Sequence, residues 1–161
     1  MRWRREDIPD HARASLGLRP RERVLAAARD GSGGWLAATE FALVGAGLRI
    51  AWVDIAHVRW LDEDRFLIVD PVPGAFAPAR FALADPGRLP EVVHERVMAS
   101  IVVSRTVALP GGGEARVVGR DDGSGELVWQ VVPGAGVDPT DATVRRTTNA
   151  AVASLRGELG R

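Results

Sequence analysis

The sequence predicts an α+β fold built on antiparallel sheet, and three observations carry this prediction. Short apolar runs with a period of two recur along the chain, separated by glycine- and proline-rich turns. Two stretches, one central and one C-terminal, change to the i, i+4 spacing of an amphipathic helix. The connections between the runs are too short for many parallel crossovers, so neighbouring strands are expected to pair antiparallel.

Several strands joined by tight turns are expected in the first half of the chain. The alternation is clearest where Leu48, Ile50 and Trp52 flank Arg49 and Ala51, as a strand with one buried face requires. Glycine clusters supply the flexible turns between neighbouring runs. The expected strands span residues 23–29, 35–38, 41–44, 48–52, 55–61, 66–69 and 79–84.

A helix and then a three-stranded meander are expected next. Leu89, Val93 and Val97 form an apolar stripe at helical spacing over 89–99, and Pro90 suits the first turn of that helix. Period-two alternation then returns, with glycine turns between the runs. The meander strands are expected at 101–109, 114–120 and 127–132.

The chain is expected to end in a helix from about Pro139 to Leu159, capped by Asp138 or Thr140. The apolar side chains of this helix lie on one face, which we expect to pack on a sheet. Residues 1–20 are predicted to form an Arg-rich N-terminal arm, or a short helix around Asp10 to Leu16.

Residues 21–161 are predicted to form a single globular domain. It would comprise a core at about 21–100 and the meander with its helix at about 101–161. The sequence leaves open whether the second part completes the first sheet or forms a second module.

Composition limits the possible functions. The chain of 161 residues has no cysteine, so disulfides, thiolate metal sites and thiol catalysis are impossible. All 21 basic residues are arginine, a bias typical of high-GC genomes such as those of actinobacteria, and the net charge is zero. No window approaches the roughly 18 apolar residues that span a bilayer, and a cytoplasmic location is expected.

Charge is nevertheless uneven along the chain. Five acidic residues lie between Asp54 and Asp70, against only Arg59 and Arg65. The first 29 residues carry eight arginines against four acids. Such asymmetry could orient an encounter with a partner, although a solvated surface also explains it.

Segments 22–25 (ERVL), 38–44 (ATEFALV) and 49–55 (RIAWVDI), followed by Val58, resemble the bacterial pleckstrin-homology-like (PH-like) domains. The resemblance covers about a quarter of the chain. It implies a PH-like roll or partly open barrel of antiparallel strands with a helix at one end. It also implies a domain used mainly to bind proteins or peptides.

Two departures from the PH-like pattern matter. Phosphoinositide-binding members use a basic first hairpin loop, whereas residues 30–34 are Asp-Gly-Ser-Gly-Gly with only Arg29 beside them. Ala51 also stands where those domains usually have proline. We therefore expect no binding of lipid headgroups.

No catalytic or cofactor motif is complete in this sequence. Glu91 and His94 share one helical turn, as in di-iron bundles, but a second such pair is missing. The glycine-rich turns lack the features of phosphate loops, dinucleotide fingerprints and nucleophile elbows. We expect no cofactor and no metal site.

Tryptophan is the aromatic residue most able to anchor a partner. Four tryptophans fall in predicted strands with apolar neighbours, where packing in or near the core is expected: Trp35, Trp52, Trp60 and Trp129. The fifth lies in the arginine-rich start of the chain. Arg2, Trp3, Arg4 and Arg5 are therefore the candidate residues for contact with a partner.

The sequence favours a non-catalytic binding domain for a protein or peptide, which could also form a homo-oligomer through an exposed strand edge. One alternative is a small-molecule-binding protein or enzyme with a pocket under the C-terminal helix. A third is weak nucleic-acid binding through the Arg-rich N-terminus.

Overall fold

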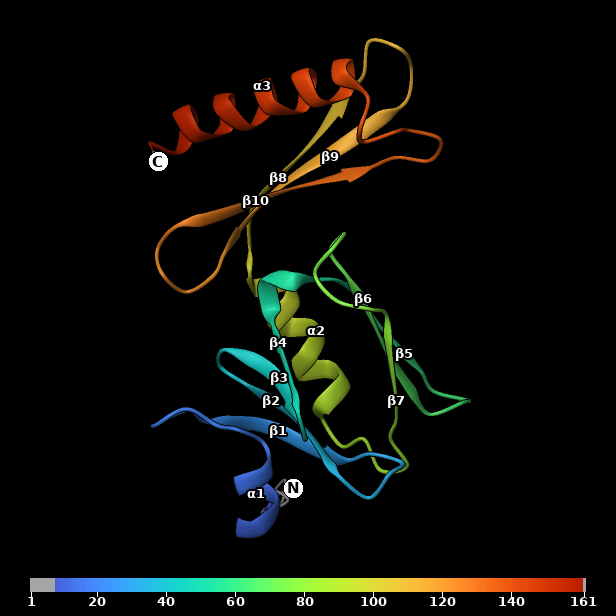
Figure 1. Ribbon diagram of the computed structural model, residues 1–161, viewed down its shortest axis with the longest axis vertical. Helices are drawn as coiled ribbons and strands as arrows, with labels where there is room; N and C mark the ends of the chain where they lie inside the picture. The colour runs from blue at the N-terminus through green and yellow to red at the C-terminus, as the bar shows by residue number, and fades with distance from the viewer. Residues whose placement is uncertain (1–7, 161) are drawn as a thin grey trace. The chain divides into compact units, whose positions relative to one another are not determined.

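The computed structural model describes residues 8–160 and has the predicted α+β architecture (Figure 1). The described residues form ten strands in three antiparallel sheets, with a middle helix and a C-terminal helix. None of these sheets closes into a barrel. The chain divides into two compact units at Ser100/Ile101, here called the N-terminal unit and the C-terminal unit.

The first sheet of the N-terminal unit is a four-stranded meander in the order β1-β2-β3-β4. Its strands are β1 (Val24–Arg29), β2 (Trp35–Thr39), β3 (Ala42–Gly45) and β4 (Leu48–Ala51). Tight turns make this order possible. Gly47, between β3 and β4, has φ +66°, a left-handed conformation that side chains with a Cβ adopt rarely.

The second sheet has the order β5-β6-β7. Its strands are β5 (Ile55–Leu61), β6 (Phe66–Pro71) and β7 (Ala79–Ala82). A 3-10 turn, η1 (Trp52–Asp54), connects it to β4, so Trp52 does not continue the strand as the sequence predicted. The buried Trp52 indole N–H instead donates to the backbone oxygen of Thr39 at 3.1 Å, which holds the ring inward.

Helix α2 (Leu89–Ala99) confirms the predicted middle helix, with a proline in its first turn. It packs against β5, β1 and β2, between the two sheets in Figure 1. The stripe Leu89, Val93 and Val97 is buried, together with Val92. Full burial of one such side chain contributes about 1.5–3 kcal/mol, so the stripe is a major part of this core.

The opposite face of the first sheet is covered by helix α1 (Asp10–Ser15). Ala12 and Leu16 are buried there against Trp35, Ala37 and other residues of the sheet. The structure therefore shows the short helix expected around Asp10 to Leu16, whereas residues 1–7 of the predicted arm lie outside the described residues. Strand β2 is consequently buried along its whole length.

The C-terminal unit is a three-stranded sheet of order β10-β9-β8 with one helix packed on it. Its elements are β8 (Ile101–Ala108), β9 (Glu114–Asp121), β10 (Leu127–Pro133) and α3 (Ala142–Leu159). These strands pair only with each other among the described residues, so they do not extend the first sheet. Whether residues 21–161 behave as one folding domain stays a prediction.

The start of α3 differs from the prediction. The N-cap is Asp141, whose carboxylate accepts hydrogen bonds from the backbone N–H groups of Thr143 and Val144, and not Asp138 or Thr140. Asp138 instead closes a turn by accepting from Thr140. Both aspartates suit a cap, and only the path of the backbone decides between them.

Candidate functional site

A hollow of about 580 Å³ lies between β5 and the first half of α2, within the N-terminal unit. We call it the β5–α2 groove. It is lined by Val58 and Trp60 from β5, by Glu91, His94 and Glu95 from α2, and by Pro86, Gly87 and Pro90 from the segment that leads into the helix.

The apolar wall of the groove comes from the alternation of β5. Val58 and Trp60 are two residues apart, so they lie on the same face of the strand, where both also pack against the main core. Each remains partly exposed, and the Trp60 indole N–H donates to Asp62 at 3.2 Å. The groove thus has an aromatic side chain at its surface that also contacts the core and Asp62.

The backbone of β5 adds a second recognition element. Strand β5 pairs with β6 on one side only, and among residues 8–160 no strand pairs with its other edge. An edge strand offers backbone N–H and C=O groups to an added strand. A polypeptide could therefore bind here through backbone hydrogen bonds.

The opposite wall of the groove is polar. Glu91, His94 and Glu95 are three and four residues apart, so they share one face of α2, and all three are exposed. Glu91 approaches Arg88 at 3.5 Å, with both side chains about half exposed, which makes the ion pair weak. Among the described residues, no recorded ion pair includes Glu95.

The arginines of the acidic stretch 54–70 are already engaged elsewhere. Arg59 points to the other face of β5 and lies 3.6 Å from Asp70. Arg65 donates to the backbone oxygen of Ala84 at 2.8 Å. Neither arginine is recorded in an ion pair with the acidic turn 62–64 that follows β5 in the described part of the chain.

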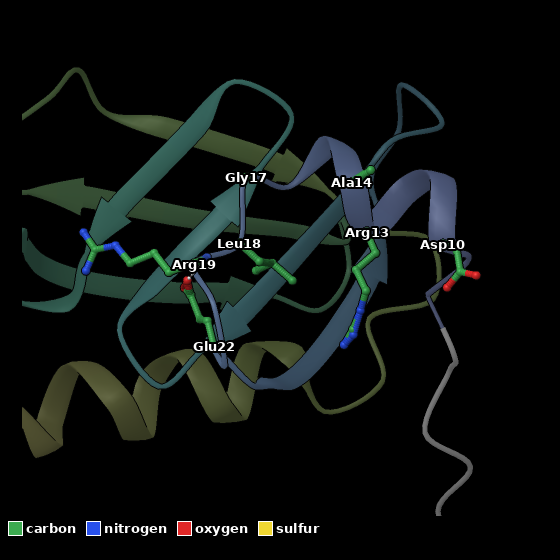
Figure 2. A pocket seen from close by; sticks show the side chains of 7 residues that line it. All are labelled: Asp10, Arg13, Ala14, Gly17, Leu18, Arg19 and Glu22. Carbon is green, nitrogen blue, oxygen red and sulfur yellow. Dashed lines mark hydrogen bonds between the residues drawn. The ribbon is translucent and has the colours of Figure 1, made fainter.

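A second hollow, of about 430 Å³, lies beside α1 (Figure 2). Its side chains do not converge: Arg13 and Arg19 extend in different directions, and the Asp10 carboxylate points away from Glu22. An arrangement of this kind offers no common point at which a ligand could bind several groups. We do not assign a function to it.

Glu22, at the edge of this second hollow, has a structural role. Its fully buried carboxylate accepts hydrogen bonds from Arg49 and Thr39, each at 2.8 Å, and from the Arg19 backbone N–H at 2.9 Å. Burial alone would raise the pKa of Glu22, but these hydrogen bonds and the Arg49 charge outweigh it and lower the pKa below its ordinary value. The carboxylate is thus held ionised as a link between β2, β4 and the segment that follows α1.

The predicted contact residues Arg2, Trp3, Arg4 and Arg5 lie outside the described residues. Their role stays a prediction. The first hairpin loop is described, and there the Asp30 carboxylate accepts from the backbone N–H groups of Ser32 and Gly34. A loop whose own N–H groups already bind a carboxylate is poorly suited to bind a phosphate. The expectation that lipid headgroups are not bound stays a prediction.

The residue pair that resembles a half of a di-iron site lies on the wall of the β5–α2 groove. Glu91 and His94 do share a helical turn, as their spacing predicted. Within residues 8–160, no group of three or more His, Asp or Glu side chains is placed to hold a metal ion.

The sequence does not predict this groove, although it predicts both the strand and the helix that line it. The predicted packing of Trp60 near the core is confirmed. The missing information was that α2 lies along β5. Two prolines around the start of α2, Pro86 and Pro90, are the local signal that this junction is rigid.

Comparisons of the chain with family models, curated proteins and solved structures gave no match. The resemblance to PH-like domains therefore stays a prediction. Among the described residues, no helix is long and apolar enough to cross a membrane.

Proposed function

We propose that this chain is a non-catalytic binding domain that takes an extended segment of another protein in the β5–α2 groove. The observation that carries this proposal is that β5, whose second edge no strand of residues 8–160 covers, also lines a hollow of about 580 Å³. Strand addition at such an edge provides affinity through the backbone, and the hollow provides specificity through alternate side chains.

Val58 and Trp60 support the proposal because they offer an apolar surface that is already ordered by the core. A partner's apolar side chain could bind them without the cost of ordering a loop. Trp60 is also of the residue type that dominates the binding energy of interfaces.

The face of the C-terminal unit under α3 is less favourable for the small-molecule alternative. There Val103 and Trp129 pack over Gly119 so closely that a Cβ on this glycine would lie 2.9 Å from Val103 Cγ1. Arg156 also lies over the Trp129 ring, at 5.9 Å. This packing fills the space between the sheet and α3 at Trp129, and the small-molecule pocket stays a prediction.

The proposal can be tested by selecting binders from a displayed library of random peptides about ten residues long. The groove is blocked in the variant His94→Trp, which places a large ring at an exposed helix position. The matched control is Asn149→Trp, an exposed position on α3 in the C-terminal unit.

We expect selected peptides to bind the wild type and the control, and to lose at least about tenfold in affinity for His94→Trp. Backbone amide NMR signals of Val58 to Trp60 should shift on binding. Peptides that bind all three proteins equally, or a selection that yields none, would contradict the proposal.

A further inference from the structure

We infer, on the basis of the proposed function, that the segment bound in the β5–α2 groove carries arginine or lysine at two alternate positions. The groove combines two exposed carboxylates, Glu91 and Glu95, with the partly exposed indole of Trp60. Carboxylates bind a guanidinium or ammonium group through charge-assisted hydrogen bonds, and an indole ring attracts the same cations through its π face. An acidic or neutral segment would leave both features unused.

The spacing of the two carboxylates supports alternate positions in the ligand. Residues four apart on a helix are separated by about 6 Å along its axis. Alternate side chains of an extended peptide are separated by about 7 Å and lie on one face. A strand added to β5 can therefore present one cation to each of Glu91 and Glu95.

The cations of the protein itself do not compete strongly for these carboxylates. Arg88 lies 3.5 Å from Glu91, but both side chains are about half exposed, so a ligand can displace this contact at little cost. Arg59 lies 3.6 Å from Asp70 in a similarly weak, exposed pair, and Arg65 donates to the Ala84 backbone oxygen, so neither is recorded as a partner of Glu91 or Glu95. Asp62, which accepts a hydrogen bond from the Trp60 indole N–H at 3.2 Å, adds a further carboxylate next to this groove residue.

Three terminally blocked peptides of about eight residues test this inference, since that length matches a typical strand. They carry valine at odd positions and arginine, glutamine or glutamate at even positions. Binding is measured by fluorescence anisotropy at about 0.1 M and about 1 M salt, where the Debye length is about 10 Å and about 3 Å. Each peptide is also titrated against His94→Trp.

We expect the arginine peptide to bind about tenfold more tightly than the glutamine peptide at the lower salt concentration, and the glutamate peptide to bind most weakly. The preference should fall to about twofold at the higher salt concentration. The double variant Glu91→Gln/Glu95→Gln should lose the preference for the arginine peptide over the glutamine peptide.

The matched control is Glu114→Gln/Glu126→Gln, which removes the same net charge from exposed positions of the C-terminal unit. If this control loses the preference equally, general electrostatic attraction explains it and the inference is overturned. If the arginine and glutamine peptides bind equally and both are sensitive to His94→Trp, the inference fails while the proposed function stands. If no peptide is sensitive to His94→Trp, both fail.

Discussion

The contacts of Glu22 show how one buried charge organises the start of the chain. Its carboxylate joins Arg49 of β4, Thr39 of β2 and the backbone N–H of Arg19. The side chain of Glu22 is completely buried, and that of Arg49 is about a quarter exposed. The segment that follows α1 is therefore fixed to the sheet by a hydrogen-bonded ion pair, and not only by apolar contact.

The substitution Glu22→Gln should lower the free energy of unfolding by about 2 kcal/mol. It keeps the shape of the side chain but leaves the Arg49 guanidinium without its charged partner. Urea unfolding at neutral pH measures the change. The matched control is Glu40→Gln, whose partner Arg23 lies 3.4 Å away and is largely exposed, and its effect should stay within about 0.5 kcal/mol.

The same carboxylate makes stability depend on pH in a defined direction. The pKa of Glu22 is lower in the folded protein than its ordinary value of 4.5, so just below that value the unfolded chain binds more protons. The stabilisation is therefore complete above about pH 4.5 and is lost as the pH falls through the folded pKa. The stability difference between wild type and Glu22→Gln should shrink on acidification, and a constant difference would contradict this.

At the scale of elements, two glycines of the C-terminal unit, one in the sheet and one in the helix, differ in how closely their surroundings are packed. Gly119 of β9 pairs with Val103 on one side and with Trp129 on the other. A Cβ there would lie 2.9 Å from Val103 Cγ1 and 3.2 Å from the Trp129 ring. Gly157 of α3, by contrast, has no neighbour within 4 Å of such an atom.

The two substitutions to alanine should therefore act in opposite directions. Gly119→Ala should destabilise the protein by about 1–3 kcal/mol, because Val103 and Trp129 must shift. Gly157→Ala should stabilise it by about 0.5 kcal/mol, because alanine favours the helix and nothing obstructs it. Thermal or urea unfolding of both variants checks the signs, and a stabilised Gly119→Ala would contradict the packing described.

At the scale of the whole molecule, the division at Ser100/Ile101 predicts unequal stability along the chain. The C-terminal unit has about 60 residues, a size at which a folded chain buries a small share of its surface. Strand β2 is buried along its whole length. We therefore expect the free energy of opening, measured by amide hydrogen exchange, to be lower for β8 to β10 than for β2. Equal opening free energies in native-state hydrogen exchange would instead support one domain over 21–161.

The sequence determined the class of fold and the position of nearly every element. Period-two alternation and helical spacing depend only on which residues are apolar, so they identified α2 from Leu89 to Ala99 and the meander after it. The start of α3 was placed too early, because Asp138 and Asp141 are equally suited to cap a helix. Trp52 was placed in a strand, because its buried hydrogen bond to Thr39 is a contact between distant residues.

Only the tertiary structure forms the groove that we propose as the binding site. Val58 and Trp60 belong to one apolar face of a strand, and Glu91 and Glu95 to one polar face of a helix, and each pattern is ordinary by itself. They become a groove because α2 packs along β5 and leaves that strand edge open. Local sequence sets which face of an element is apolar, but it carries no information on which distant element that face meets.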